Sequence, residues 1–146
     1  MSMLENLKNT IKGKLDSVTA IQEVHAYPEI KFNGYPAATI VPSENESDFE
    51  TTTENTRVYA FAVRLFSQIK GSGLEKAYGQ MYNLIDEVLD EFDKDQALTG
   101  LTMPDGYTLE ISEALPSSVG LVAETDLLMA MVNIRVRILI DTKIIT

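Results

Sequence analysis

The chain has 146 residues, of which 45% are hydrophobic and 23% charged, and this composition is typical of one globular domain large enough to bury its own core. It has no cysteine, which excludes disulfides, thiol catalysis and thiolate metal sites. The formal net charge of −10 argues against a nucleic-acid-binding surface, which needs clustered Lys and Arg, but allows a wall that DNA passes without adhering.

The organisation of the chain indicates a single domain over residues 1–146, because no linker divides it. The first fifteen residues mix polar and apolar side chains and lack the apolar run of a signal peptide. No stretch is apolar over the ~18–20 residues that a membrane span needs. We therefore expect the protein in a soluble compartment, or in a particle assembled there.

The first predicted element is a helix over residues 3–16, where Leu4, Leu7, Ile11 and Leu15 form an apolar stripe. Ser2 and the glutamate three residues later have the spacing of a capping box, which satisfies free N–H groups at a helix start. Residues 20–27 are compatible with a short strand.

Two strands and a long connection are predicted next. Residues 35–41 form a strand with Pro36 near its start and Pro42 at its end, where proline is tolerated. Residues 43–56 are acidic and contain no Lys or Arg, and we interpret them as a hairpin connection whose second half is already strand. Residues 57–69 are apolar on both faces, which predicts a central, covered strand.

A second helix is predicted over residues 74–92, which carry the strongest helical periodicity in the chain. The segment Gly71-Ser72-Gly73 precedes it, as a phosphate-binding loop would, but Lys76 stands where the third glycine is required. Ser72 and Glu75 have capping-box spacing instead, so this turn is predicted to cap the helix.

Two further strands complete the prediction. After a loop over residues 93–103 and a Pro-Asp-Gly turn, residues 107–115 alternate Tyr107, Leu109, Ile111 and Glu113 on one face, until residues 116–118 end the strand. Residues 127–141 form a final strand with a face of Val and Ile opposite a face that carries Arg135 and Arg137. The order αββαββ predicts an α+β fold, with a mostly antiparallel sheet and both helices packed on one face.

Candidate catalytic and metal sites fail on their spacing. The carboxylates of residues 86–91 lie on the polar side of the second helix, where a solvated surface that repels other anions is the better interpretation than acid–base catalysis. His25 is the only histidine, which argues against zinc, and Asp93-Lys94-Asp95 lacks the glycine of a calcium loop. We predict no enzyme activity, no cofactor and no metal.

Interface residues are predicted in two places. Arg135 and Arg137 share one strand face, which is compatible with a solvated surface, an intrachain ion pair or a protein interface. We favour a contact with acidic residues of a neighbouring subunit. The acidic connection is the second candidate, for reaching a neighbouring subunit or another protein, through Glu44, Glu46, Asp48 and Glu50.

The layout of the chain resembles that of phage tail-terminator and tail-completion proteins. The similarity is carried by ATIVPSE at residues 38–44, by NTRVYAFAVRLF at residues 55–66, and by the closing RVRILID at residues 135–141. Tyr78 and Tyr82, followed by Leu-Ile-Asp-Glu-Val, match the helix of this layout. The similar region covers nearly the whole chain, but it transfers no catalytic or ligand residue.

This resemblance implies a virion protein that forms a homohexameric ring, caps the tail tube and joins the tail to the head or neck, with DNA passing through its lumen. Its partners would be copies of itself, the tail tube protein and a head-completion or neck protein. It would be assembled in the host cytoplasm without a membrane. Two alternatives remain open: a head-completion or neck connector, and a small-ligand-binding α+β domain unrelated to phages.

Overall fold

A six-stranded sheet forms the framework of the computed structural model, which describes residues 2–29, 31–43, 46–49, 54–69, 73–123 and 125–143, with the backbone alone for residues 46–49. Within these ranges the strands follow the order β1-β2-β4-β6-β5, and β3 pairs with β4 beyond the end of β2. The bounds are Glu23–His25 for β1, Ala37–Pro42 for β2, Glu46–Phe49 for β3, Glu54–Gln68 for β4, Tyr107–Leu121 for β5 and Leu127–Asp141 for β6.

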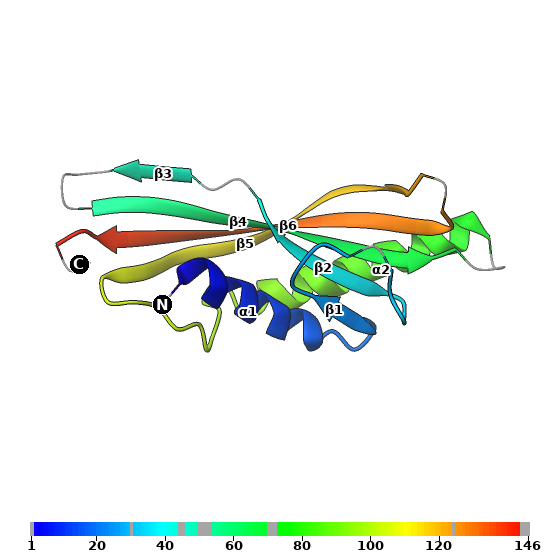
Figure 1. Ribbon diagram of the computed structural model, residues 1–146, viewed down its shortest axis with the longest axis horizontal. Coiled ribbons are helices and arrows are strands. Elements are labelled where there is room, and N and C mark those ends of the chain that lie inside the picture. The colour runs from blue at the N-terminus through cyan, green and yellow to red at the C-terminus, as the bar shows by residue number, and fades with distance from the viewer. Residues whose placement is uncertain are drawn as a thin grey trace.

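The sheet is long because three of its strands, β4, β5 and β6, each contain 15 residues. At roughly 3.4 Å per residue, such a strand extends about 50 Å. Every pairing is antiparallel except that of β1 with β2, which is parallel. Figure 1 shows the resulting elongated molecule, with both helices on one side of the sheet.

The α+β class and the mostly antiparallel sheet are thus confirmed, whereas the predicted order αββαββ is wrong. The described residues follow the order αββββαββ, because β1 and β3 form strands of their own. Both are short, with three and four residues, and both border longer strands. Strands of this length carry too few residues for a periodic signal in the sequence.

Helix α1 (Met3–Asp16) has the predicted bounds and the predicted cap, since the Glu5 N–H donates to Ser2 Oγ over 3.2 Å. Its buried stripe starts one residue earlier than predicted. Met3 is buried together with Leu7, Ile11 and Leu15, whereas Leu4 is 37% exposed. Positions four residues apart lie on one side of a helix, so Met3 continues the stripe and Leu4 lies beside it.

Helix α2 (Leu74–Asp93) begins one residue too late for the predicted capping box. Its N-cap is Gly73, at φ +91°, a conformation that glycine adopts readily, and no side chain caps the helix. The residue three positions beyond this cap is Lys76 rather than Glu75, so the capping-box prediction is wrong. Ser72 itself lies outside the described residues.

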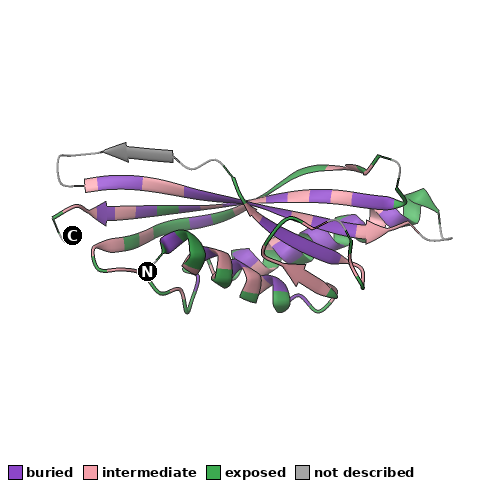
Figure 2. Ribbon diagram, viewed as in Figure 1, coloured by how far each residue is buried: buried purple, intermediate pink, exposed green. Residues whose placement is uncertain are grey.

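One apolar cluster joins both helices to the same face of the sheet. The side chains of β6 alternate, so that its even-numbered residues from Leu128 to Ile140 are all completely buried. Figure 2 shows this alternation as bands along β6. The cluster also includes residues from α1, α2, β2 and β4, among them Leu7, Ile11, Met81, Val88, Ile40, Phe61 and Val63. We call this side of the sheet the core face.

Strands β2 and β3 form one interrupted arm along β4. Pro42 pairs with Phe61 and Glu46 pairs with Val58, so the arm advances four residues (46 − 42) while β4 advances three (61 − 58). Pairing with β4 is described again from Glu46, within the predicted acidic connection, and residues 50–53 lie outside the described residues.

A register shift in β5 reverses the predicted faces of its second half. The shift lies between Leu109 and Ile111, and it places Ser112 opposite the buried Val136. An extra residue moves every later side chain to the other face of a sheet. Ile111 and Glu113 therefore do not share a face with Leu109, contrary to the prediction. The buried Ser112 hydroxyl instead donates to the Gln96 carbonyl over 2.6 Å.

The prediction that residues 116–118 end this strand is also wrong. Strand β5 continues to Leu121, through a second register shift between Pro116 and Val119. The strand lies at the edge of the sheet, where proline is tolerated.

Two isoleucine-to-alanine substitutions test which face each residue occupies. We expect Ile134→Ala, which removes a completely buried side chain, to lower the free energy of unfolding by about 2–5 kcal/mol. Ile111→Ala, at a side chain that is 47% exposed, should change it by less than about 1 kcal/mol. Denaturant unfolding of the dissociated protein measures both. Equal losses would contradict the register shift before Ile111.

Candidate subunit interface

The second face of the sheet is not covered by either helix. We call it the open face, and its residues come from three adjacent strands: Val58, Ala60, Ala62 and Arg64 of β4, Ile111, Glu113 and Leu115 of β5, and Met129, Met131, Asn133, Arg135, Arg137 and Leu139 of β6. Apolar side chains remain accessible on it, with Ile111 47% and Leu115 43% exposed.

The predicted arginine pair lies at the centre of this open face. Arg135 and Arg137 are alternate residues of β6, so they project from the same face, as predicted. With Val58, Ile111 and Glu113 they line a hollow of about 320 Å³. The Nε atom of Arg137 lies 2.9 Å from the carboxylate of Glu110, and its side chain is still 48% exposed. The open face thus combines apolar surface with accessible guanidinium groups.

The other two arginines have different environments. Arg64 also lies on the open face, where its buried Nε atom has no hydrogen-bond partner among the described residues. Arg57 lies on the core face and donates to the hydroxyls of Tyr59 and Tyr107 over 3.2 and 3.3 Å. The hydrogen bond to Tyr59 is the main cause that raises the pKa of Arg57. Arg57 therefore ties β4 to β5, whereas Arg64 adds to the open face.

One end of the open face is covered by the segment between β1 and β2. The centroid of the Phe32 ring lies 5.2 Å from that of Phe66 on β4 and 5.7 Å from that of His25. The Glu23 carboxylate holds this segment, since it accepts from the Asn33 N–H over 2.9 Å and lies 2.9 Å from His25 Nε2. The contact with His25, followed by the hydrogen bonds from the backbone N–H groups, lowers the pKa of Glu23.

The acidic connection is only partly described. Glu44 and Glu50 lie outside the described residues. Glu46 and Asp48 belong to β3, where their backbones pair with Val58 and Thr56 of β4. Since Val58 pairs in turn with Arg137, β3 runs in the same sheet at the level of the arginines. The interface role of these four acidic residues stays a prediction.

A second charged surface lies on α2, on the side away from the sheet. Tyr82, Asp86, Asp90 and Asp93 are exposed and recur at steps of four, four and three residues, which places them on one side of the helix. We call them the acidic stripe. Tyr82 is 54% exposed, and its ring centroid lies 6.0 Å from that of Tyr78.

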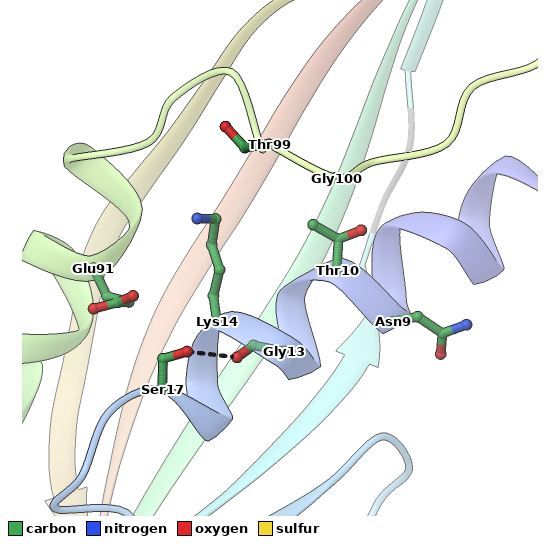
Figure 3. A pocket seen from close by; sticks show the side chains of 8 residues that line it. All are labelled: Asn9, Thr10, Gly13, Lys14, Ser17, Glu91, Thr99 and Gly100. Atoms are coloured by element: carbon green, nitrogen blue, oxygen red, sulfur yellow. Dashed lines mark hydrogen bonds between the residues drawn. The ribbon is translucent and has the colours of Figure 1, made fainter.

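The structure also contains a groove that bears on the small-ligand alternative. Figure 3 shows it between α1, the end of α2 and the following loop, with a volume of about 450 Å³. Lys14 is its natural anion-binding group, but Lys14 Nζ lies 2.8 Å from Asp95 Oδ2. Asp95 also accepts from Thr99, and these contacts, that with Lys14 above all, lower the pKa of Asp95. The ion pair of Lys14 with Asp95 neutralises the charge of the lysine and holds the loop after α2 against α1.

Among the described residues, no three His, Asp or Glu side chains are grouped so that they could hold a metal ion. Of the two described helices, neither combines the length and the apolar character needed to cross a membrane.

Comparison with known proteins gives a fold likeness. No protein-family model and no curated protein matches this sequence. Among solved structures, a chain of the "Virion of native gene transfer agent (GTA) particle" is similar, with a TM-score of 0.59 and 14% sequence identity. The alignment covers 90% of this chain and 93% of that chain. At this identity the likeness shows that the two chains share a fold.

The Glu23 contacts predict how the free energy of unfolding depends on pH. Because the pKa of Glu23 is lowered below its ordinary 4.5, its carboxylate stabilises the folded state above that value, and the contribution is lost as the pH falls through the folded-state pKa. We expect Glu23→Gln to be less stable than the wild type near neutral pH, with the difference closing in acid. Urea unfolding across this range measures it. Glu87→Gln, at an exposed residue of α2, is the control. A difference in stability between Glu23→Gln and the wild type that does not change with pH would refute this role of Glu23.

Proposed function

We propose that this protein is a virion structural protein, a tail terminator whose homohexameric ring caps the tail tube and joins the tail to the head or neck. The observation that carries the proposal is the fold likeness, over 90% of the chain, to a chain of a virion particle. The layout of residues 38–44, 55–66 and 135–141, which resembles that of tail terminators, supports it from the sequence. The protein would act in the virion, at the junction of tail and neck.

The open face supports self-assembly. A single copy leaves apolar residues such as Ile111 and Leu115 exposed beside Arg135 and Arg137. Arginine is enriched at protein interfaces, and exposed apolar surface on a sheet often marks one. In this proposal the protein is not an enzyme and needs no cofactor, because its function is to bind neighbouring subunits, the tail tube and a neck protein.

The charge of the chain supports a conduit for DNA. With a formal net charge of −10, a ring of several copies would be surrounded by a strongly negative potential. Repulsion between such a ring and the phosphate backbone would let DNA pass through the lumen without binding.

The second candidate is a head-completion or neck connector. The fold likeness to a chain of a virion particle supports it equally, and the open face would serve either ring. The small-ligand-binding alternative has less support, because Asp95 neutralises the lysine of the groove in Figure 3.

Assembly on tail tubes tests the proposal. We expect the purified protein to form hexamer-sized rings, or discs at the ends of purified tail tubes, because the open face needs a partner to cover it. Mass measurement over a concentration series and negative-stain imaging, with and without tubes, measure this. A protein that stays monomeric at all concentrations and does not bind tube ends would refute the proposal.

Particle morphology separates the two ring candidates. Loss of a tail terminator should leave tails of uncontrolled length, because nothing stops the growing tube. Loss of a connector should leave tails of normal length that fail to join heads. Electron microscopy of particles that lack this protein measures tail length directly.

A further inference from the structure

We propose that Asn33 is a site of spontaneous deamidation, which the carboxylate of Glu23 slows and which releases the cover over one end of the open face. The reaction converts the Asn33 side chain to a carboxylate and needs no enzyme. It gives the chain a slow change of charge and of structure beside its candidate interface. This site does not depend on the proposed ring.

The first observation is the sequence at this position. Asn33 is followed by Gly34, and this is the only Asn-Gly pair in the chain. Deamidation begins when the backbone nitrogen of the next residue attacks the side-chain amide carbon of an asparagine. Glycine in that position favours the attack, because it has no side chain to hinder the approach and its backbone adopts the widest range of conformations.

The second observation is that water reaches the pair. Asn33 is exposed and Gly34 is half-buried, and residues 31–36 belong to no helix or strand. Both residues of the pair line a hollow of about 290 Å³, together with Tyr35 and Gln80. The backbone here is therefore not fixed by a ladder of hydrogen bonds, and the second reactant has access to it.

The reaction consumes one water molecule and releases one ammonia molecule. In the first step, the Gly34 nitrogen loses its proton and bonds to the side-chain carbonyl carbon of Asn33. The bond from that carbon to the amide nitrogen breaks, and the amide group leaves with the proton as ammonia, so that a cyclic imide remains. In the second step, water adds to one of the two imide carbonyl carbons and breaks its bond to the Gly34 nitrogen, which regains a proton. The product is aspartate or isoaspartate, according to the carbonyl that water attacks.

Glu23 is the group that restrains the first step. Its Oε2 atom accepts from the Asn33 N–H over 2.9 Å and from the Gly34 N–H over 3.4 Å. The Gly34 N–H is the one that must be lost, and a carboxylate beside it disfavours a negative charge on that nitrogen. The same two contacts hold the backbone in one conformation, whereas ring closure requires it to rotate.

Both products disrupt these contacts. An aspartate at position 33 places a second carboxylate next to Glu23, and like charges repel. An isoaspartate lengthens the main chain by one carbon atom and displaces the two N–H groups. The same segment carries Phe32, whose ring packs on Phe66 of β4. Deamidation therefore loosens the cover over that end of the open face.

Ageing of the purified protein tests the site. We expect wild-type protein kept at mildly alkaline pH to form aspartate and isoaspartate at position 33, because alkaline pH promotes loss of the amide proton. Peptide mapping by mass spectrometry after ageing in heavy-oxygen water measures this, since the water that opens the imide leaves its oxygen in the product. Asn83, exposed on α2 and followed by Leu84, is the internal control and should stay unmodified. If Asn33 stays intact in the folded protein while it reacts in urea-unfolded protein, the proposal is wrong.

Glu23→Gln tests the restraint. We expect deamidation of Asn33 to become about fivefold faster, because the repulsion of two like charges about 4 Å apart in water corresponds to a factor of that size. Ile134→Ala is the matched control, since it lowers the stability of the fold and leaves Glu23 in place. An unchanged or lower rate in Glu23→Gln, or an equal acceleration in both variants, would overturn the role of Glu23.

Asn33→Asp tests the release of the cover. Trypsin cleaves after lysine, and Lys31 is exposed in the same segment. We expect cleavage after Lys31 to be about fivefold faster than in the wild type, because the same repulsion opens the segment. Asn33→Gln keeps a neutral amide and should be cleaved like the wild type. Equal cleavage of the two variants would show that the new carboxylate leaves the cover in place, and would refute its release.

Discussion

The pairing of β4 with β6 is the constraint on which the rest of the structure depends. The two strands align without a register shift from Glu54 opposite Asp141 to Gln68 opposite Leu127. This long ladder fixes which side chains of each strand face the helices, because alternate residues of a strand project to opposite faces. Strand β5 is added on one side, and β2 and β3 on the other. The length of the ladder also makes the sheet much longer than either helix.

From this ladder follows the difference between the two faces. The core face of β6 consists of Val, Ile, Leu and Ala and is completely buried by helices α1 and α2. The other face of the same strand carries Asn133, Arg135 and Arg137, and no helix covers it. Arg137 pairs with Glu110, and a charged pair of this kind is less costly on a face exposed to water than in an apolar core. The helices cover only one side of the sheet, which leaves the other side for the contacts that the proposed ring requires.

Charged side chains are distributed unevenly over the fold. Ten of the 22 acidic residues lie on α2 and in the connection before β4, whereas all four arginines lie on strands of the sheet. The fold likeness to a chain of a gene transfer agent particle supports the proposed role in a virion.

The sequence by itself determined the α+β class, both helices within one residue at each end, the central position of β4 and the shared face of Arg135 and Arg137. These features depend on local periodicity, which is visible in any single strand or helix. The tertiary structure alone decided what depends on pairing between distant segments. It placed β1 beside β2 and β3 beside β4, carried β5 past Pro116, and put Ile111 on the open face rather than in the core. A register shift leaves no periodic signature, because it is the partner strand that selects which residue is left unpaired. The same holds for the position of the chain just after α2 relative to β5. The hydrogen bond from Ser112 to the Gln96 carbonyl fixes that position, and no local pattern in the sequence predicts it.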